Sequence, residues 1–295
     1  EDFFTPWHGV FYAGFTVLAA WIGLIGYRRR RPASSLLEWF PTAYRPAVIG
    51  MIVFAIGGVG DAIWHTVFGV EVGIDALLSP THLVLFAGSL LLLWTPVRAS
   101  ADRADTSPWL AIGAATLTTS LLVFLAQYLW LVPYSVYAQQ FFDPNTGAGT
   151  GTVQLFLAST MVSSAILVGP LRLIGRRWAL PIGSAAVIWG VAAALESLAF
   201  SQVFWPVLLV AAAGLVHDLV LVGARRHPRL RASSAMAAAF AGPAALFGGY
   251  LVLARIDGPL GWPPEIWGGL VVMAGLVGAG LVLLEQSGRA EPISG

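Results

Sequence analysis

The stretch Gly60-Asp61-Ala62-Ile63-Trp64-His65 ends one apolar run of the sequence, over 46–65, and Ser79-Pro80-Thr81-His82 opens the next, over 80–97. Each run is long enough to cross a bilayer as a helix, which takes about 20 residues. Ser79 and Pro80 suit the N-cap and the first position of a helix. Since consecutive crossings run in opposite directions, we expect the end of the first run and the start of the second to lie at the same membrane face.

The composition of the chain supports this interpretation. Of its 295 residues, 57% are hydrophobic and only 11% are charged, whereas a soluble domain carries about 25% charged residues. The sequence therefore predicts a polytopic membrane protein with the lipid bilayer as its partner. No basic patch lies beside aromatic residues outside the membrane-flanking loops, so we expect no nucleic-acid partner.

Two residue types are missing from the sequence. The chain has no cysteine, which excludes disulfides, thiolate metal sites, iron–sulfur ligation and a cysteine nucleophile. All sixteen basic residues are arginine, so the chain has no lysine to form a Schiff base with retinal or pyridoxal phosphate. Any metal would have to be held by histidine or carboxylate side chains.

Nine apolar runs are long enough to cross the membrane: 7–27, 46–65, 80–97, 108–132, 152–171, 179–200, 203–223, 233–254 and 266–285. We therefore expect an all-α polytopic helix bundle of about nine transmembrane helices, forming a single transmembrane domain over 1–295. The shortest connection joins the sixth and seventh runs around Ser201 and Gln202.

The arginines predict the orientation of these helices. Fifteen of the sixteen fall in alternate loops or after the last run, and Arg255 alone falls on the opposite side. Because arginine gathers in cytoplasmic loops, the N-terminus is expected outside and the C-terminus in the cytoplasm. We expect the cytoplasmic (inner) membrane of a bacterium. On the outer side, the aromatic and glycine-rich loop 133–151 is either a lid or partner surface or an ordinary connection.

The same topology brings ligand-type side chains to the outer face. His8 follows Thr5-Pro6-Trp7, in the same frame that carries His82, and Asp61 and His65 share one helix face at a spacing of four residues. Ionisable groups at membrane depth are costly and suggest function. Imidazole with carboxylate suits copper, zinc or iron, so we predict a metal site of His8, Asp61, His65 and His82, with copper favoured.

Further acidic residues are expected near this site. Glu71 and Asp75 lie in the loop between the two helices and, with Asp61, are candidates for catalytic proton transfer. Glu265 follows Trp262-Pro263-Pro264, where the two earlier frames carry histidine, so it is a further candidate metal ligand or orienting group.

Two other interpretations of the outer cluster stay open. The histidines are suited to axial ligation of haem or a chlorin, and equally to a structural or proton-relay network. A second polar pair, His217 and Asp218, lies toward the inner half of its run, close to Arg225 and Arg226. It is either part of a proton path or an interfacial ion pair.

An aspartate followed four residues later by histidine at a helix end, and then by a histidine opening the next helix, resembles one known pattern. It is similar to the metal-binding segment of the C subunit of copper membrane monooxygenases, the particulate methane and ammonia monooxygenases. The resemblance covers about 25 residues and implies that Asp61, His65 and His82 are copper ligands. His8 has no counterpart there, and the gap from His65 to His82 is a few residues longer.

Together these features predict a metal-dependent oxidase or monooxygenase, or a metal-bearing subunit of one, acting on a small apolar or lipidic substrate. The chain has no soluble cofactor domain, so such an enzyme needs partner membrane subunits or an external electron donor. Three alternatives remain: a copper- or zinc-handling transporter or assembly factor, a zinc-dependent intramembrane hydrolase, and an accessory subunit whose polar cluster only locks helices together.

Overall fold

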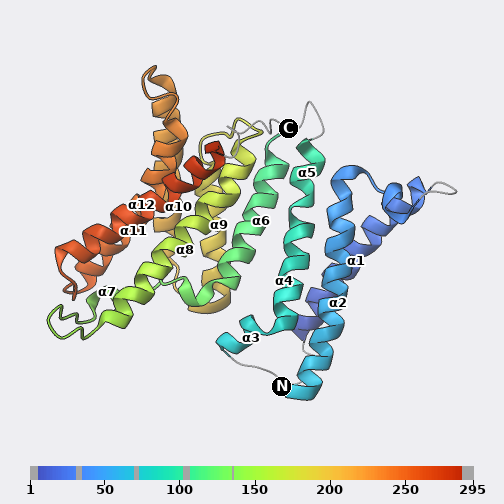
Figure 1. Ribbon diagram of the computed structural model, residues 1–295, viewed down its shortest axis with the longest axis horizontal. Helices are drawn as coiled ribbons and strands as arrows, with labels where there is room; N and C mark the ends of the chain where they lie inside the picture. The colour runs from blue at the N-terminus through green and yellow to red at the C-terminus, as the bar shows by residue number, and fades with distance from the viewer. Residues whose placement is uncertain (1–5, 31–34, 70–72, 102–106, 135, 288–295) are drawn as a thin grey trace, which may run out of the picture. The chain divides into compact units, whose positions relative to one another are not determined.

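The computed structural model describes residues 6–30, 35–69, 73–101, 107–134 and 136–287, and these residues form helices and connections with no strand among them (Figure 1). The α-helices are α1 (Pro6–Arg29), α2 (Arg45–Phe68), α3 (Ile74–Leu78), α4 (Pro80–Leu93), α5 (Thr95–Ala101), α6 (Trp109–Leu125), α7 (Val136–Gln139), α8 (Thr150–Gly175), α9 (Ser184–Glu196), α10 (Trp205–Arg226), α11 (Ser234–Asp257) and α12 (Pro264–Ser287). Short 3-10 turns lie at Leu36–Trp39, Thr42–Tyr44 and Gln127–Leu129, and a π-helical turn, η4 (Ser197–Ser201), continues α9.

Eight segments of the described chain are long and apolar enough to cross a membrane, counting α4 with α5 and α9 with η4. They confirm the all-helical, membrane-spanning class. The remaining predicted run, 108–132, contains α6, which has 17 residues and ends at Leu125. After it the chain turns through Gln127–Leu129, while Trp130, Leu131 and Val132 are buried without being helical. The count of nine crossings therefore stays a prediction.

Contacts between Cα atoms divide the chain into two compact units, residues 1–114 and 115–295, with the boundary inside α6. We call them the first and the second unit. The single transmembrane domain expected over 1–295 stays a prediction.

In the first unit, α2 and α4 form the main helix pair because glycines let their backbones approach closely. A Cβ atom at Gly88 would lie 2.7 Å from the backbone nitrogen of Phe54, and one at Gly57 would lie 3.0 Å from Leu85. Small residues at such contacts are typical of membrane helices. Helix α1 packs on the same pair, with the rings of Phe15 and Phe54 stacked at 4.2 Å between centroids.

The second unit is built from α8 to α12 around large buried side chains, including Phe156, Trp189, Phe247 and Tyr250. At one end of this unit the carboxyl ends of α8 and α12 meet. Arg172 and Arg176 there lie 3.1 and 3.3 Å from the carboxylate oxygens of Glu285. The neighbouring pair α9 and α10 are separate helices, as the sequence predicted, and join through η4 and Gln202, which adopts a left-handed conformation.

The loop 133–151 belongs to the second unit and, apart from Ser135, is described. Hydrogen bonds tie it to α11 and to the chain that follows α11: Tyr250 donates to the Tyr134 carbonyl at 2.7 Å, and Gly261 N–H donates to the Ala138 carbonyl at 2.9 Å. Its tip is a turn around Asp143, whose carboxylate accepts from the Asn145 N–H, and this hydrogen bond lowers the pKa of Asp143. Its role as a lid or partner surface stays a prediction.

Candidate metal centre

The residues that end α2 and begin α4 determine where the two halves of the site lie. Helix α2 ends at Gly69, whose φ of 83° suits a residue without Cβ and whose N–H donates to the His65 carbonyl at 3.1 Å. Helix α4 begins as the sequence predicted, with Ser79 as N-cap and Pro80 at the first turn. The Ser79 hydroxyl accepts from the backbone N–H of His82 at 3.4 Å. The end of one helix and the start of the next thus present their histidines to each other.

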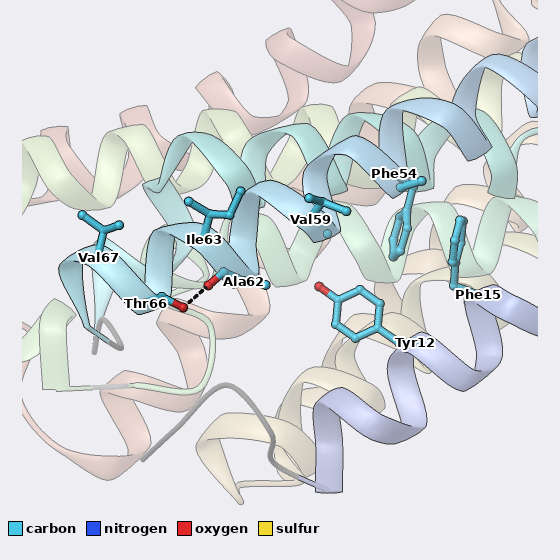
Figure 2. Close-up of a pocket in the computed structure, with 10 residues that line it drawn as sticks. Tyr12, Phe15, Phe54, Val59, Ala62, Ile63, Thr66 and Val67 are labelled. Carbon is cyan, nitrogen blue, oxygen red and sulfur yellow. Dashed lines mark hydrogen bonds between the residues drawn. The ribbon is translucent and has the colours of Figure 1, made fainter.

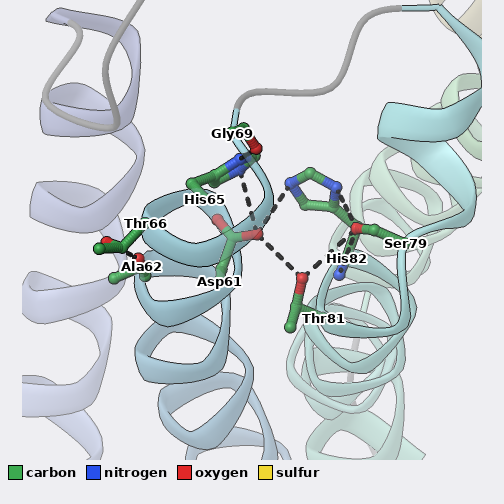
Figure 3. A network of polar contacts seen from close by, with 8 residues as sticks. All are labelled: Asp61, Ala62, His65, Thr66, Gly69, Ser79, Thr81 and His82. Atoms are coloured by element: carbon green, nitrogen blue, oxygen red, sulfur yellow. Dashed lines mark hydrogen bonds and ion pairs between the residues drawn. The ribbon is translucent and has the colours of Figure 1, made fainter.

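Asp61, His65 and His82 form one tight group (Figure 3). The Nε2 atoms of His65 and His82 lie 3.4 and 3.2 Å from the same carboxylate oxygen, Oδ1 of Asp61. One ligand atom from each residue lies within 4.8 Å of the other two. Metal bonds of about 2.0–2.1 Å place tetrahedral ligand atoms about 3.3–3.5 Å apart. A transition metal ion therefore fits this group after a small movement of the side chains.

The hydrogen bond on the far side of the His65 ring fixes where its proton lies. The His65 Nδ1 atom is 3.2 Å from the Gly69 carbonyl oxygen, which can only accept a hydrogen bond. Nδ1 therefore carries a proton, and in a ring with no second proton the lone pair of Nε2 points toward Asp61. Two hydrogen-bond acceptors facing each other at 3.4 Å repel unless a cation, either a metal ion or an added proton, lies between them.

The His82 ring is oriented in a similar way by the start of its own helix. Its Nδ1 atom lies 2.8 Å from the Ser79 hydroxyl, which can both donate and accept. Next to it, the Thr81 hydroxyl donates to Oδ1 of Asp61 at 3.1 Å. Hydrogen bonds of this kind to the outer side of metal ligands fix ring orientation and commonly strengthen metal binding.

Burial makes the charge of Asp61 costly. Its side chain is 1% exposed, and its second oxygen, Oδ2, has no hydrogen-bond partner in the described part of the chain. Tyr12 of α1 lies close enough to this carboxylate to interact with it electrostatically. A buried carboxylate is stable only when paired or bound to a metal. Asp61 therefore needs positive charge beside it, from a protonated imidazole or from a metal ion.

His8 lies next to this group rather than inside it. Its ring, on α1, has its centroid 6.4 Å from the centroid of the His65 ring, and the group of three within 4.8 Å does not include it. Its role as a ligand stays a prediction.

The structure leaves the acidic candidates untested. Glu71 lies outside the described residues, as does the side chain of Asp75. Glu265 is exposed in the first turn of α12, in the second unit, so its place among the ligands stays a prediction.

Sequence reasoning did not single out Thr81, Ser79 or Tyr12 as members of the site. Signals for all three were present. Ser79 and Thr81 belong to the Ser-Pro-Thr-His frame that carries His82, and Tyr12 follows His8 by four residues, on the same helix face.

Comparison of the chain with family models, curated proteins and solved structures finds no match. The resemblance to the monooxygenase C subunit therefore rests on the spacing of Asp61, His65 and His82 alone.

Proposed function

We propose that the protein is an integral membrane metalloprotein that binds one transition metal ion through Asp61, His65 and His82. The observation that carries this proposal is the convergence of two imidazole rings and one carboxylate. Two imidazole Nε2 atoms approach one buried carboxylate oxygen, and the opposite nitrogen of His65 is already committed as a donor. A metal ion would remove the repulsion between Nε2 of His65 and Asp61 and compensate the buried charge.

The ligand set favours a redox metal. Two histidines and one carboxylate, with further positions open, are the set of non-haem Fe(II) oxygenases, and among divalent ions nitrogen and oxygen sites bind Cu(II) most tightly. Copper remains our first choice, with iron or zinc as alternatives. His8 is the proposed fourth ligand, because it lies next to His65, and Glu265 is a further candidate.

We further propose that the metal serves an oxidase or monooxygenase reaction on a small apolar or lipidic substrate. In the monooxygenase case R–H, O2, two electrons and two protons give R–OH and water, and the bound metal supplies the O2 chemistry. Glu71, Asp75 or Glu265 would deliver the protons. The electrons would come from a partner membrane subunit or an external donor. The spacing of the ligands and the open positions of the set support this reaction.

The membrane topology of the chain is part of the same proposal. Nine crossings, with the N-terminus outside, would place the metal at the outer face of the cytoplasmic membrane of a bacterium. The arginine distribution supports this orientation.

A transporter of copper or zinc has less support. A transport path needs a series of ligand sites, whereas the described residues contain one group of three or more ligand-type side chains. A zinc hydrolase would use the same ligands with a carboxylate as general base. Zinc as the native metal, with hydrolysis independent of O2, would favour that alternative.

The test is elemental analysis of protein purified from its native membrane, with O2 consumption measured on the same samples. We expect about one copper or iron ion per chain, loss of that ion in His65→Ala and in His82→Ala, and O2 uptake only in metal-loaded protein given an electron donor. The matched control, His217→Ala, removes a buried histidine of the second unit and should keep the metal. Equal metal content in all three variants would contradict the ligand assignment.

A further inference from the structure

A groove of about 760 Å³ lies along the packed helices α11 and α12, inside the second unit. Its lining comes from the second half of α11, the connection that follows and the first two turns of α12. This connection joins two candidate membrane spans, so the groove lies where the chain leaves the hydrocarbon core. Two lining residues, Trp262 and Trp267, suit this position, because tryptophan is enriched at membrane–water interfaces.

Arg255 carries the charge of the groove. It is the only charged side chain among the described residues that line it, and the one arginine that the sequence places on the side opposite the other fifteen. Arg255 is exposed in the last turn of α11, and no ion pair or side-chain hydrogen bond of the described chain includes its guanidinium group. The N–H donors of this group are therefore available to a ligand.

The rest of the groove is an apolar channel that opens sideways. Leu251 and Val271 line its walls, and Gly248 leaves space, because an added Cβ there would lie 4.0 Å from Val271. Val252 and Ile256 form the rim and are 60% and 76% exposed. In a membrane span such a rim contacts lipid chains. The channel thus runs from lipid to a guanidinium group near the interface.

A cleft in the first unit shows what Arg255 adds. This cleft, of about 620 Å³, lies between α1 and α2 and is also lined mainly by apolar residues, Phe15 and Phe54 among them (Figure 2). None of the described residues that line it is charged. Such a cleft has no group that selects a charged headgroup, whereas the groove between α11 and α12 does.

We propose that the groove between α11 and α12 binds one anionic phospholipid, such as a phosphatidylglycerol. The phosphate accepts hydrogen bonds from the guanidinium group of Arg255, a pairing whose planar geometry favours two parallel bonds. One acyl chain lies along Leu251 and Val271, and the open rim at Val252 leaves the second chain among the bilayer lipids. This site lies in the second unit and does not depend on the proposed metal centre.

The experiment is native mass spectrometry of the delipidated protein in detergent, titrated with dioleoyl phosphatidylglycerol. We expect one tightly bound lipid per chain. Arg255→Gln should weaken this binding about 10–100-fold, the usual loss when a charge-assisted pair is removed. Arg231→Gln is the matched control, because Arg231 is an exposed arginine of the second unit outside the groove, and its variant should bind as the natural protein does.

A second pair of variants tests the channel. Gly248→Leu places a side chain in the groove and should weaken binding about tenfold, the scale of misfit in an apolar pocket. Gly280→Leu is its control, since a Cβ at Gly280 of α12 meets no atom within 4 Å and the residue lies outside the groove. Its affinity for the lipid should be unchanged.

Two further ligands separate the sources of an anionic headgroup. Dioleoyl phosphatidylcholine has the same chains but a zwitterionic headgroup, and should bind more weakly, because no acidic residue lines the groove to pair with its ammonium group. Oleate should not displace phosphatidylglycerol at equal concentration. Displacement by oleate, equal affinity for phosphatidylcholine, or equal lipid affinity of Arg255→Gln and Arg231→Gln would overturn the inference.

Discussion

The two units each bury a histidine–aspartate pair, and the two pairs differ in what surrounds the carboxylate. In the second unit, Oδ2 of Asp218 accepts the backbone N–H groups of Gly183 and Ala185 at 2.9 and 3.0 Å, at the start of α9. His217 lies 3.3 Å from the other oxygen. In the first unit, Asp61 accepts the Thr81 hydroxyl and faces two imidazoles.

This difference separates a structural carboxylate from a candidate metal ligand. Gly183 precedes α9 and has no side chain to cap it, so Asp218 of α10 supplies the missing acceptor and ties two helices together. Asp61 is surrounded by side chains instead: the Thr81 hydroxyl donates to it, and Tyr12 and the rings of two histidines lie beside it. The kind of group that reaches each carboxylate distinguishes the two sites: backbone N–H groups at Asp218, and two imidazole rings at Asp61.

The largest expected effect comes from exchanging each aspartate for asparagine. Asp61→Asn should abolish metal binding, because an amide is a poor metal ligand. The thermal stability of the metal-free protein should be unchanged or higher, because the substitution removes the buried negative charge at position 61. Asp218→Asn should keep the metal and lower the stability by about 1–3 kcal/mol, because hydrogen bonds to a charged acceptor are weakened. Metal titration and thermal unfolding in the same detergent measure both quantities.

The opposite result would refute the proposed difference between Asp61 and Asp218. If Asp61→Asn destabilised the apo protein as much as Asp218→Asn does and metal binding survived, Asp61 would be a structural residue like its counterpart.

A smaller effect is expected from the groups that orient the ligands. Thr81→Val removes the hydroxyl that donates to Asp61 and should weaken metal binding about 10–100-fold. Thr95→Val is the control, because the Thr95 hydroxyl is also buried but donates to the Leu91 carbonyl of the preceding turn. Competition with a metal chelator of known affinity measures the change, and similar affinities in the two variants would refute a role for Thr81.

The smallest change in affinity is expected from helix packing. Gly88→Ala places a Cβ 2.7 Å from the Phe54 backbone and should cost about 1–3 kcal/mol of stability. It should also weaken metal binding several-fold, since it pushes His82 away from Asp61. Gly214→Ala creates an equally tight contact with Ala186 in the second unit and should destabilise without changing the affinity. If Gly88→Ala and Gly214→Ala lowered the metal affinity equally, the loss would follow from lower overall stability and not from the position of His82.

Much of the first unit could be predicted from the sequence. The spacing of Asp61 and His65 defines a helix face, Ser79-Pro80 defines a helix start, and alternating crossings define the level of His82. These are local rules, and the structure agrees with each of them.

Rotation of a helix about its axis is not set by such rules. His8 was expected at the level of the cluster, and its ring centroid lies 6.4 Å from that of His65, compared with 5.7 Å between the rings of His65 and His82. Its membership of the site depends on the rotation of α1, which spacing along the sequence does not define. The helix cap that Asp218 provides could not be predicted from the sequence either. It joins Asp218 to Ala185 and Gly183, which lie 33 and 35 positions earlier in the chain. Hydropathy also overstated the helix over 108–132, since Trp130 to Val132 are buried in a non-helical segment and hydropathy reports burial rather than helicity.

The central claim is that two imidazoles and one carboxylate of the first unit hold a single metal ion. Electron spin-echo envelope modulation of the Cu(II)-loaded protein tests it most directly, because it counts the imidazoles bound to the ion. The account predicts the remote-nitrogen signal of at least two imidazoles, reduced by one in His65→Ala and in His82→Ala and unchanged in His217→Ala. A signal without imidazole, or one that these two variants leave intact, would contradict it.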